Sequence, residues 1–481
     1  MSADAICWRS ATELIAHYRD RSLSPVEVTD AILRRIDRLN PLLTAYITVT
    51  PELALKQARV AEAAYQPGGS PGPLAGIPIS IKDLTPTKGI RTTRGSLIDP
   101  DWVPDDDPPF VERVLAAGAV MLGKTNTPEF GWKGDSGNRI AGPTHNPWRQ
   151  GRTAGGSSGG AAAAVAAGLG PLAQGSDGAG SIRIPCGFCG IFGIKPSFGL
   201  IPQYPPSAVG DLSHLGPITR TVRDAALMLT VTAGADARDR LSWTSGIDYL
   251  TSMAGGAIAG LRVAWSPDLG YAPVEPAVRE ATEVAARRFI DLGCVVEEAT
   301  PELLDPWDIV HPIWSAGMAG LHATNLDEVR DKLDPGRLAV IEQGQTYSAV
   351  DLANAFQRRN TYAEGMHRFM ESYDLLLTPT LPCTAFPAGD DHPGQIAGQQ
   401  TTYLNWTPFT YPFNLTGQPA ATVPCGVDGD GLPVGLQIVG RWHDDVTVLR
   451  AAAAFEEVAP WAYHRPDFSD WDTTARPVPM T

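Results

Sequence analysis

The chain has 481 residues, of which 43% are hydrophobic and 19% charged, and this composition is typical of a globular protein with a large core. A formal net charge of −15 argues against nucleic acid as a partner, because an acidic surface repels phosphate groups. No segment approaches the roughly 18 uninterrupted apolar residues of a membrane-spanning helix, and the first residues do not resemble a secretory signal. We therefore expect a cytoplasmic protein that binds neither nucleic acid nor membrane.

Three helices are predicted before residue 65. Apolar residues recur at helical spacing between residues 10 and 37, which indicates two amphipathic helices. Ser24 and Pro25 are typical of the start of the second helix, with an N-cap residue followed by proline at the first helical position. A third helix is expected over residues 52–64.

The next segment alternates strands with helices. Residues 77–81 and 120–123 are short apolar runs bounded by glycine or proline, which predicts two buried strands. Between them and after them, helices are expected at 110–117 and 161–167. Residues 172–175 then predict a strand that leads to Ser181. This alternation favours an α/β sandwich around one sheet.

The same alternation continues to residue 458. Helices are expected at 223–233, 275–292 and 446–458, and strands at 261–265, 294–298, 374–378, 421–424 and 435–439. We predict a single large α/β/α sandwich around a mixed, mostly parallel sheet. Its expected parts are N-terminal helices (1–65), a core (66–230), a peripheral helical and α/β lobe (231–370), strands and a helix that complete the sheet (371–458), and a C-terminal tail (459–481).

A lysine and two serines are the candidate catalytic residues. A serine hydroxyl needs a base to act as a nucleophile at neutral pH. None of the nine histidines lies in a glycine-rich elbow, and the chain has no Gly-x-Ser-x-Gly motif. Lysine can serve instead, because burial lowers its pKa from about 10.4. Lys82 follows the apolar run 77–81, so Lys82, Ser157 and Ser181 can supply a base, a proton relay and a nucleophile.

Glycine-rich backbone surrounds both serines. The run at 155–160 allows the main chain to approach a ligand closely, and the helix that follows it begins with amides that favour negative charge. The amides of Gly178, Ala179 and Gly180 precede Ser181 and can point at a developing oxyanion. Read alone, the first run is equally typical of a flexible loop or a phosphate cradle. It lacks the Gly-Lys-Ser/Thr ending of a P-loop, which weakens the case for a nucleotide.

Together these segments resemble the amidase signature family. The lysine motif is Gly-Ile-Pro-Ile-Ser-Ile-Lys-Asp at residues 76–83, and the serine and glycine stretch covers residues 155–160 and 175–183. Lys82 and Ser157 are 75 residues apart, and Ser157 and Ser181 are 24 apart, as in the family. The resemblance extends roughly from residue 10 to residue 457. It implies the amidase signature fold, with the catalytic core at 66–230 and no cofactor or metal.

The resemblance also implies a role for each residue at the reacting centre. Ser181 would be the nucleophile, Ser157 a bridging serine that follows a cis peptide bond, and Lys82 the neutral base. The amides of Gly178, Ala179 and Gly180 would form the oxyanion hole. These residues would cleave an amide C–N bond through an acyl-enzyme.

Residues around this centre would have supporting roles. Ser158, Asp177 and Arg183 would hold the loop by hydrogen bonds. By the same resemblance, Phe130, Gly131 and Trp132 would line the leaving-group side of the pocket.

The chain departs from the commonest family pattern, Asp-Thr-Gly-Gly-Ser, at two positions. Gly178 stands where threonine or isoleucine is frequent, and the smaller residue would enlarge the pocket rim. Ala179 stands where glycine is frequent, and its methyl group restricts positive φ. Aromatic residues between 403 and 413 are equally typical of core packing and of a cleft wall beside the proline-rich rim at 203–206. If they face the cleft, they favour a bulky apolar substrate.

Three functions are compatible with these motifs. The first is a stand-alone hydrolase of aryl, hydrophobic or cyclic amides that also accepts carbamates or esters, acting on a small-molecule substrate as a monomer or homodimer. The second is the glutamine-hydrolysing amidase component of a tRNA-dependent amidotransferase, against which the aromatic residues argue. The third is a non-catalytic phosphate binder. Cys186 and Cys189 have the spacing of a redox motif, but we expect them to be small buried side chains.

Overall fold

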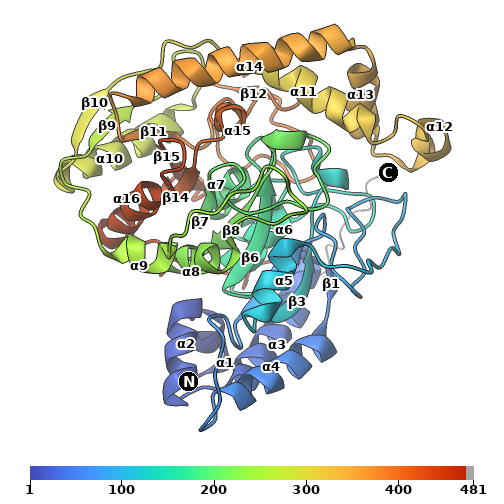
Figure 1. Cartoon of the computed structure of the whole chain (residues 1–481), viewed down its shortest axis with the longest axis vertical. Coiled ribbons are helices and arrows are strands. Elements are labelled where there is room, and N and C mark those ends of the chain that lie inside the picture. Colours follow the sequence, from blue (N-terminus) through green and yellow to red (C-terminus); the bar gives the residue numbers. More distant parts are fainter. Residues whose placement is uncertain (473–481) are drawn as a thin grey trace.

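Helices at the N-terminal end of the chain pack beside one edge of the central sheet (Figure 1). They are α1 (Ala3–Cys7), α2 (Ala11–Asp20), α3 (Pro25–Leu43) and α4 (Pro51–Ala64), in a computed structural model that describes residues 1–472. A capping box begins α2: the Ser10 hydroxyl accepts the Glu13 N–H, and the Glu13 carboxylate accepts the Ser10 N–H. Pro25 is the first residue of α3, as predicted. The three predicted N-terminal helices are thus confirmed.

An 11-stranded sheet runs through the molecule in the order β1-β3-β2-β6-β8-β7-β14-β15-β11-β9-β10. Its strands are β1 (Tyr46–Val49), β2 (Pro78–Lys82), β3 (Val120–Thr125), β6 (Leu172–Asp177), β7 (Phe192–Lys195), β8 (His214–Thr219), β9 (Arg262–Trp265), β10 (Val295–Glu298), β11 (Leu375–Pro379), β14 (Ala420–Val427) and β15 (Pro433–Gly440). The strands predicted from apolar runs are confirmed, whereas β1, β7 and β8 were not predicted. Two hairpins lie outside this sheet: β4 (His145–Asn146) with β5 (Arg149–Thr153), and β12 (Gln395–Ile396) with β13 (Gln399–Gln400).

The sheet is mixed, as predicted, but it is not mostly parallel. Parallel pairs lie towards its two ends, where β2 pairs with β3 and β6, and β9 pairs with β10 and β11. All other neighbouring strands run antiparallel, including the middle of the sheet from β6 to β11. The physical reason is the short connection between β14 and β15, which allows only an antiparallel hairpin. The return of β8 beside β6 and β7 adds further antiparallel pairs.

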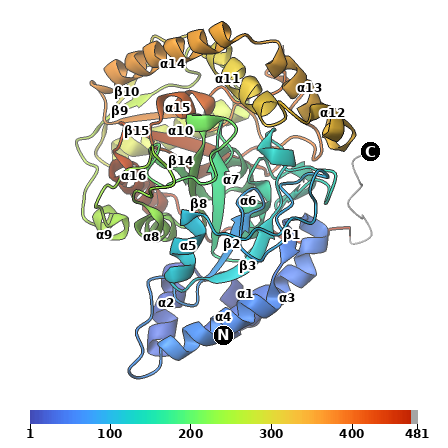
Figure 2. The ribbon, with the colours of Figure 1, turned by 45° about the vertical axis from the view of Figure 1, so that its right-hand side comes forward.

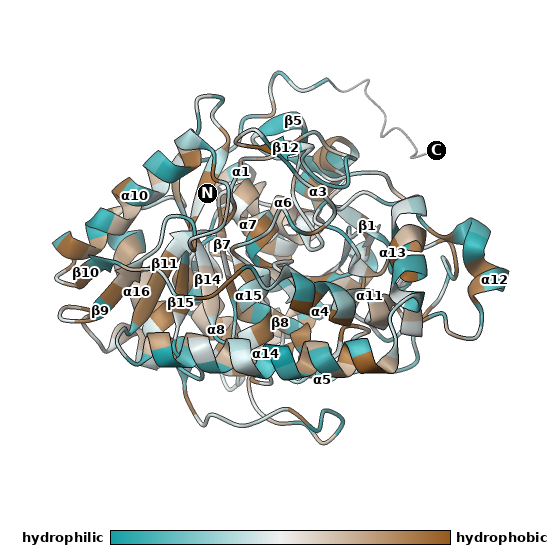
Figure 3. Ribbon diagram, turned by 90° about the horizontal axis from the view of Figure 1, so that it is seen from above, coloured by the Kyte–Doolittle hydropathy of each residue, from teal (hydrophilic) through white to brown (hydrophobic). Residues whose placement is uncertain are grey.

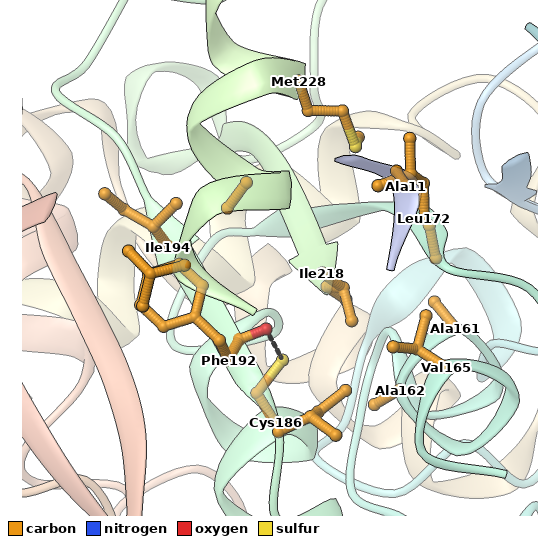
Figure 4. Packing of buried hydrophobic residues seen from close by; sticks show 14 of the residues in the cluster. Ala11, Ala161, Ala162, Val165, Leu172, Cys186, Phe192, Ile194, Ile218 and Met228 are labelled. Atoms are coloured by element: carbon orange, nitrogen blue, oxygen red, sulfur yellow. Dashed lines mark hydrogen bonds between the residues drawn. The ribbon is translucent and has the colours of Figure 1, made fainter. Parts of the chain in front are cut away.

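Helices cover both faces of the sheet (Figure 2). They are α5 (Pro109–Ala116), α6 (Gly159–Ala166), α7 (Arg183–Cys189), α8 (Val222–Thr232), α10 (Pro276–Asp291) and α16 (Asp445–Val458). Figure 4 shows how closely α6 approaches its neighbours: Ala161, Ala162 and Val165 lie beside Ile218 of β8 and Cys186 of α7. The small side chains of α6 let its backbone come close to the sheet. This packing fixes the glycine runs at the start of α6 and before α7.

A helical lobe covers the carboxyl side of β6 (Figure 1). It contains α11 (Trp307–Gly320), α12 (Leu326–Val329), α13 (Pro335–Gln345) and α14 (Ala349–Met370). Helix α15 (Tyr411–Thr416) packs against α14, whereas α9 (Tyr249–Ala254) packs against α8 and α16. Hydrophilic and hydrophobic bands alternate along α14 in Figure 3, as expected of a helix with one buried face. The lobe has its own apolar cluster, in which Trp314 and Met318 of α11 pack with Ala179 and Val209. The loop before Ser181 thus touches this lobe.

Residues 459–472 add no strand to the sheet. Residues 459–472 follow α16 without forming a further helix or strand, and the rest of the predicted tail, 473–481, lies outside the described residues. Within residues 1–472, no helix is both long enough and apolar enough to cross a membrane.

Candidate active site

Lys82 is the last residue of β2, and its side chain is completely buried. Its Nζ atom lies 2.6 Å from Ser157 Oγ, 2.9 Å from Ser158 Oγ and 3.0 Å from Ser176 Oγ. Burial holds the pKa of Lys82 well below its usual value, and the nearby Asp177 carboxylate only partly opposes this shift. Within residues 1–472, Lys82 makes no ion pair. The surroundings therefore favour a neutral amine among hydroxyl groups.

Ser157 lies at the start of the turn that leads into α6. The peptide bond between Gly156 and Ser157 is cis, as the resemblance implied. A Cβ atom on Gly156 would lie 2.7 Å from the carbonyl carbon of Asp135, so only glycine fits this position. Ser157 is almost completely buried, and its hydroxyl bonds to Lys82.

Ser181 lies in the loop between β6 and α7, beside the Ser157 turn. Its carbonyl oxygen accepts the N–H of Ser158 at 3.2 Å, which joins the two glycine-rich segments. Ser157 and Ser181 line the same cavity. Among the described residues, the Ser181 hydroxyl has no hydrogen-bond partner. The structure thus brings Lys82, Ser157 and Ser181 into one site and leaves the Ser181 hydroxyl facing the cavity.

Asp177 and Arg183 hold the ends of the Ser181 loop together. The Arg183 guanidinium donates to Asp177 through Nη2 at 2.9 Å and Nε at 3.0 Å, and the amides of Gly180 and Ile182 donate to the same carboxylate. Asn414 of α15 also donates to it, at 2.9 Å. Burial alone would raise the pKa of Asp177, but the charge and hydrogen bonds of Arg183, together with Lys195 and Asn414, outweigh burial and hold the pKa well below its usual range.

The backbone amides before Ser181 are not equivalent. The Gly180 N–H is only 2.7 Å from Asp177 Oδ1 and is therefore already used, so its predicted place in the oxyanion hole is corrected. The amides of Gly178, Ala179 and Ser181 have no partner within residues 1–472. Gly180 also carries the loop's positive φ of 128°, whereas the φ of Ala179 is not positive. The alanine therefore fits the loop without backbone strain.

The cavity has a volume of about 310 Å³, which is in the range of a small-molecule pocket. Its apolar walls include Leu84, Trp102, Phe130, Val209, Trp314 and Met318. The predicted proline-rich rim at 203–206 also lines it. The cavity thus lies between the Ser181 loop, the residue 130 segment and helix α11.

Two of the three predicted leaving-group residues line this cavity. Phe130 and Gly131 do so, but Trp132 is only 2% exposed and stacks on Tyr403 at 5.2 Å between ring centroids. Trp132 therefore lies behind the wall, which corrects its predicted position on it. Among the aromatic residues at 403–413, Trp406, Phe409, Tyr411 and Phe413 are buried, Tyr403 is partly buried, and none of them lines the cavity.

Sequence reasoning missed three residues of this site. Ser176 contacts Lys82, and the signal for it is its place on β6, the strand that pairs with β2 beside Lys82. Trp314 and Arg94 reach the cavity from α11 and from the loop after β2. No local pattern marks these two residues, because only the fold brings them to the cavity.

The histidines and the Cys186–Cys189 pair lie outside the reacting centre. None of the described histidines lines the cavity. His214 is buried on β8, where burial holds its pKa well below the usual value. Both cysteines are free and buried, and the Cys186 thiol lies 3.6 Å from the Phe192 carbonyl oxygen (Figure 4). The expectation of small buried side chains is confirmed.

Comparisons with known proteins agree with this architecture. The family model described as Amidase matches residues 27–449, and the chain therefore belongs to the amidase family. An acylamidase from Rhodococcus erythropolis is 41% identical over 471 residues, which cover 97% of this chain and 98% of the relative. The predicted amide-hydrolysing class of enzyme is thus confirmed.

Two further proteins bear on the substrate. A solved bacterial aryl acylamidase of the amidase signature family superposes with a TM-score of 0.89 at 32% identity, covering 95% of this chain and 97% of that one. A glutamyl-tRNA(Gln) amidotransferase subunit from Moorella thermoacetica is 37% identical over 486 residues, covering 95% of this chain and 98% of that relative.

Proposed function

We propose that this protein hydrolyses aryl or otherwise hydrophobic amides through an acyl-enzyme on Ser181, with Ser157 as the proton relay and Lys82 as the base. The observation that carries the proposal is the contact of 2.6 Å between Lys82 Nζ and Ser157 Oγ, made by a lysine whose burial favours the neutral amine. Ser181 lies in the same cavity with its hydroxyl free for attack.

Acylation would follow from this arrangement. Ser181 Oγ attacks the amide carbonyl carbon and gives its proton to Ser157 Oγ, while Ser157 passes its own proton to Lys82 Nζ. The C–N bond then breaks, and the relay returns the proton to the leaving nitrogen. The contact between the two serines forms when substrate binds, since catalytic hydrogen bonds often tighten only in the complex.

Deacylation would use the same groups in the reverse sense. Water attacks the acyl carbon and loses a proton through Ser157 to Lys82, and Ser181 takes a proton back as the carboxylic acid leaves. The amides of Gly178, Ala179 and Ser181 are the available donors to the oxyanion. Losing one such donor typically costs about 3–4 kcal/mol of barrier stabilisation.

The cavity walls support an apolar substrate. Trp102, Phe130, Trp314 and Met318 offer aromatic and aliphatic contacts beside Ser181. One relative is named as an acylamidase, and a solved structure is named as an aryl acylamidase, which supports an aryl amide as the substrate. Cyclic amides, carbamates and esters present the same carbonyl to the site, so we extend the proposal to them as secondary substrates.

Relatives named as glutamyl-tRNA(Gln) amidotransferase components make a glutaminase the alternative function. Purified chain tested alone on an anilide and on glutamine separates the two. Anilide hydrolysis that is lost in Ser181→Ala supports the proposal. Glutamine hydrolysis that requires partner proteins, with no anilide turnover, would replace it.

The setting of the enzyme is part of the proposal. Six free cysteines are typical of a reducing compartment, and we place the protein in the cytoplasm as a monomer or homodimer that acts on a small molecule. The net charge of −15 supports the absence of a nucleic-acid partner. Light scattering on the purified chain, with and without RNA, measures its oligomeric state and whether it binds RNA.

A further inference from the structure

Arg94 lies on the cavity wall in the loop that follows β2. Its guanidinium is placed between two rings, 4.0 Å from the centroid of Trp102 and 5.6 Å from that of Phe130. The backbone is fixed on both sides, because the Arg94 N–H donates to the Asp83 carbonyl and the Arg94 carbonyl accepts the Phe130 N–H at 2.8 Å. The residue has a positive φ of 57°, which few non-glycine residues adopt. Arg94 is therefore held firmly at the cavity.

The Arg94 guanidinium has no polar partner in the part of the chain that the structure describes. It makes no hydrogen bond or ion pair with any residue from 1 to 472, and the carboxylates of Asp99 and Asp83 attract it only from beyond ion-pair distance. It is also the only charged side chain among the described residues that line the cavity. A guanidinium that is partly buried and unpaired favours an anion in the same space.

A second arginine beside Phe130 provides a contrast. Arg337 lies 4.2 Å from the Phe130 ring centroid, but it is fully buried and does not line the cavity. Its charge is matched by Glu129 at 3.6 Å, and its Nη2 atom contacts His322 at 2.8 Å. Arg337 is therefore ion-paired with Glu129 outside the cavity, whereas Arg94 lies on the cavity wall and has no ion-pair partner within residues 1–472.

The position of Arg94 also indicates which part of the substrate it contacts. Phe130 continues into Gly131, where a Cβ atom would lie 3.2 Å from Ser157 Oγ. In the proposed relay, Ser157 hands the proton to the leaving nitrogen. The wall that carries Arg94 therefore faces the amine part of the substrate, and the wall of Trp314 and Val209 faces the Gly178 loop.

Resting on the proposed function, we propose that Arg94 binds a carboxylate on the amine part of the substrate, so that the preferred substrates are N-acylated aminobenzoates. The aromatic ring would lie among Trp102, Phe130 and Leu84, and its carboxylate would accept the free guanidinium hydrogens. Arg94 is then a specificity-determining residue for the hydrolysis.

The test compares 4-acetamidobenzoate with its neutral isostere 4-acetamidobenzamide. We expect the wild type to favour the carboxylate at least tenfold in kcat/KM, and Arg94→Gln to lose this preference. Arg94→Lys keeps the charge and is expected to keep part of the preference. The exposed Arg59, which lies on α4 away from the cavity, gives the control variant Arg59→Gln, whose preference is expected to match the wild type.

Binding of the amine products tests the same inference without turnover. Calorimetry is expected to show tighter binding of 4-aminobenzoate than of 4-aminobenzamide to the wild type, and the difference is expected to vanish in Arg94→Gln. Equal binding of both amines, or an equal loss for both in the variant, would overturn the proposal. A preference that follows a carboxylate on the acyl part instead would also overturn it. Absence of all anilide turnover would count against the proposed function, while the binding result still decides the role of Arg94.

Discussion

Arg183 donates two side-chain hydrogen bonds to Asp177, from Nη2 to Oδ1 at 2.9 Å and from Nε to Oδ2 at 3.0 Å, and both side chains are fully buried. The same carboxylate accepts the Gly180 amide, which lies next to Ser181. The ion pair therefore sets the path of the loop that carries the proposed nucleophile. The carboxylate also accepts the Ile182 amide, whereas the amides of Gly178, Ala179 and Ser181 have no partner among residues 1–472.

Replacing Asp177 with asparagine is expected to destabilise the fold by about 3–5 kcal/mol, because Arg183 would be left as an unpaired buried charge. Denaturant unfolding at pH 7 measures the change. The depressed pKa of Asp177 adds stability above its unfolded value of about 3.9, and this stability is lost as the pH falls towards the lower folded value. The wild type is therefore expected to lose more stability than the variant below about pH 4.

An exposed ion pair provides the control for this prediction. Glu283 and Arg287 pair on the surface of α10, with exposed fractions of 44% and 71%. Glu283→Gln is expected to change the free energy of unfolding by less than about 1 kcal/mol, since surface pairs contribute little. Equal losses of unfolding free energy in the two variants would show that burial does not increase the contribution of the Asp177 pair to stability.

Lys82 is expected to give the acid limb of the pH profile. Burial lowers the pKa of this lysine, and only the neutral amine accepts a proton, so kcat/KM is expected to fall as the pH drops through that pKa. Lys82→Met is expected to lower kcat at least about a thousandfold, because the relay no longer has a base to accept the proton. Lys82→Arg is expected to be equally inactive, because a guanidinium stays protonated.

The exposed Lys56 of α4 gives the matched control, Lys56→Met, which is expected to keep the wild-type profile. Near-normal turnover by Lys82→Arg would exclude a neutral base at this position. Steady-state kinetics between pH 5 and pH 10 decide between these results, with circular dichroism used to confirm that each variant is folded.

Local pattern predicted much of the fold. Apolar runs such as 77–81 were predictable because a strand that is buried on both faces is apolar throughout, and helices such as 446–458 because they bury one face at a fixed period. The pairing of the strands was not, since β6, β7 and β8 meet through contacts distant in sequence. The antiparallel middle of the sheet therefore came only from the structure.

The candidate site divides in the same way. Lys82, Ser157 and Ser181 lie in segments whose spacing is distinctive, so the sequence brought them together. The cavity wall depends on side-chain packing, and for that reason Trp132 was placed on the wall although it stacks behind it, and Arg94 was missed. The use of the Gly180 amide depends on where Asp177 points, which no motif specifies.

Gly180→Ala is expected to lower kcat/KM by about a hundredfold or more, comparable to the loss of an oxyanion donor. The new Cβ would lie 2.4 Å from Thr410 Oγ1, and φ is 128°, so the loop must move. Thr410 donates to the Ala179 carbonyl, and its displacement shifts the free amides. Gly246→Ala is the control: it has a φ of +68° but open space around it. A similar loss of activity in both variants would attribute the effect to general instability.

The last prediction concerns the contact between Gly178 and Trp314. A Cβ atom at position 178 would lie 3.0 Å from the Trp314 ring and 3.3 Å from Val209, so the indole occupies the space that a larger residue would need. Gly178→Thr is therefore expected to cost about 1–3 kcal/mol of stability through overpacking, and to lower kcat/KM for an anilide.

Trp314→Ala removes the opposing ring. It is expected to lower the stability of the fold because it leaves a cavity, and it removes an aromatic wall of the pocket. In the double variant the threonine occupies part of that space, so its loss of stability is expected to be smaller than the sum of the two single losses by at least about 0.5 kcal/mol. Denaturant unfolding of all four proteins gives this coupling energy. The exposed Trp442 provides the control pair, because Trp442→Ala combined with Gly178→Thr is expected to be additive. Additivity in the Trp314 cycle would show that the two residues do not share the space. The glycine at position 178 would then have a reason other than its contact with Trp314.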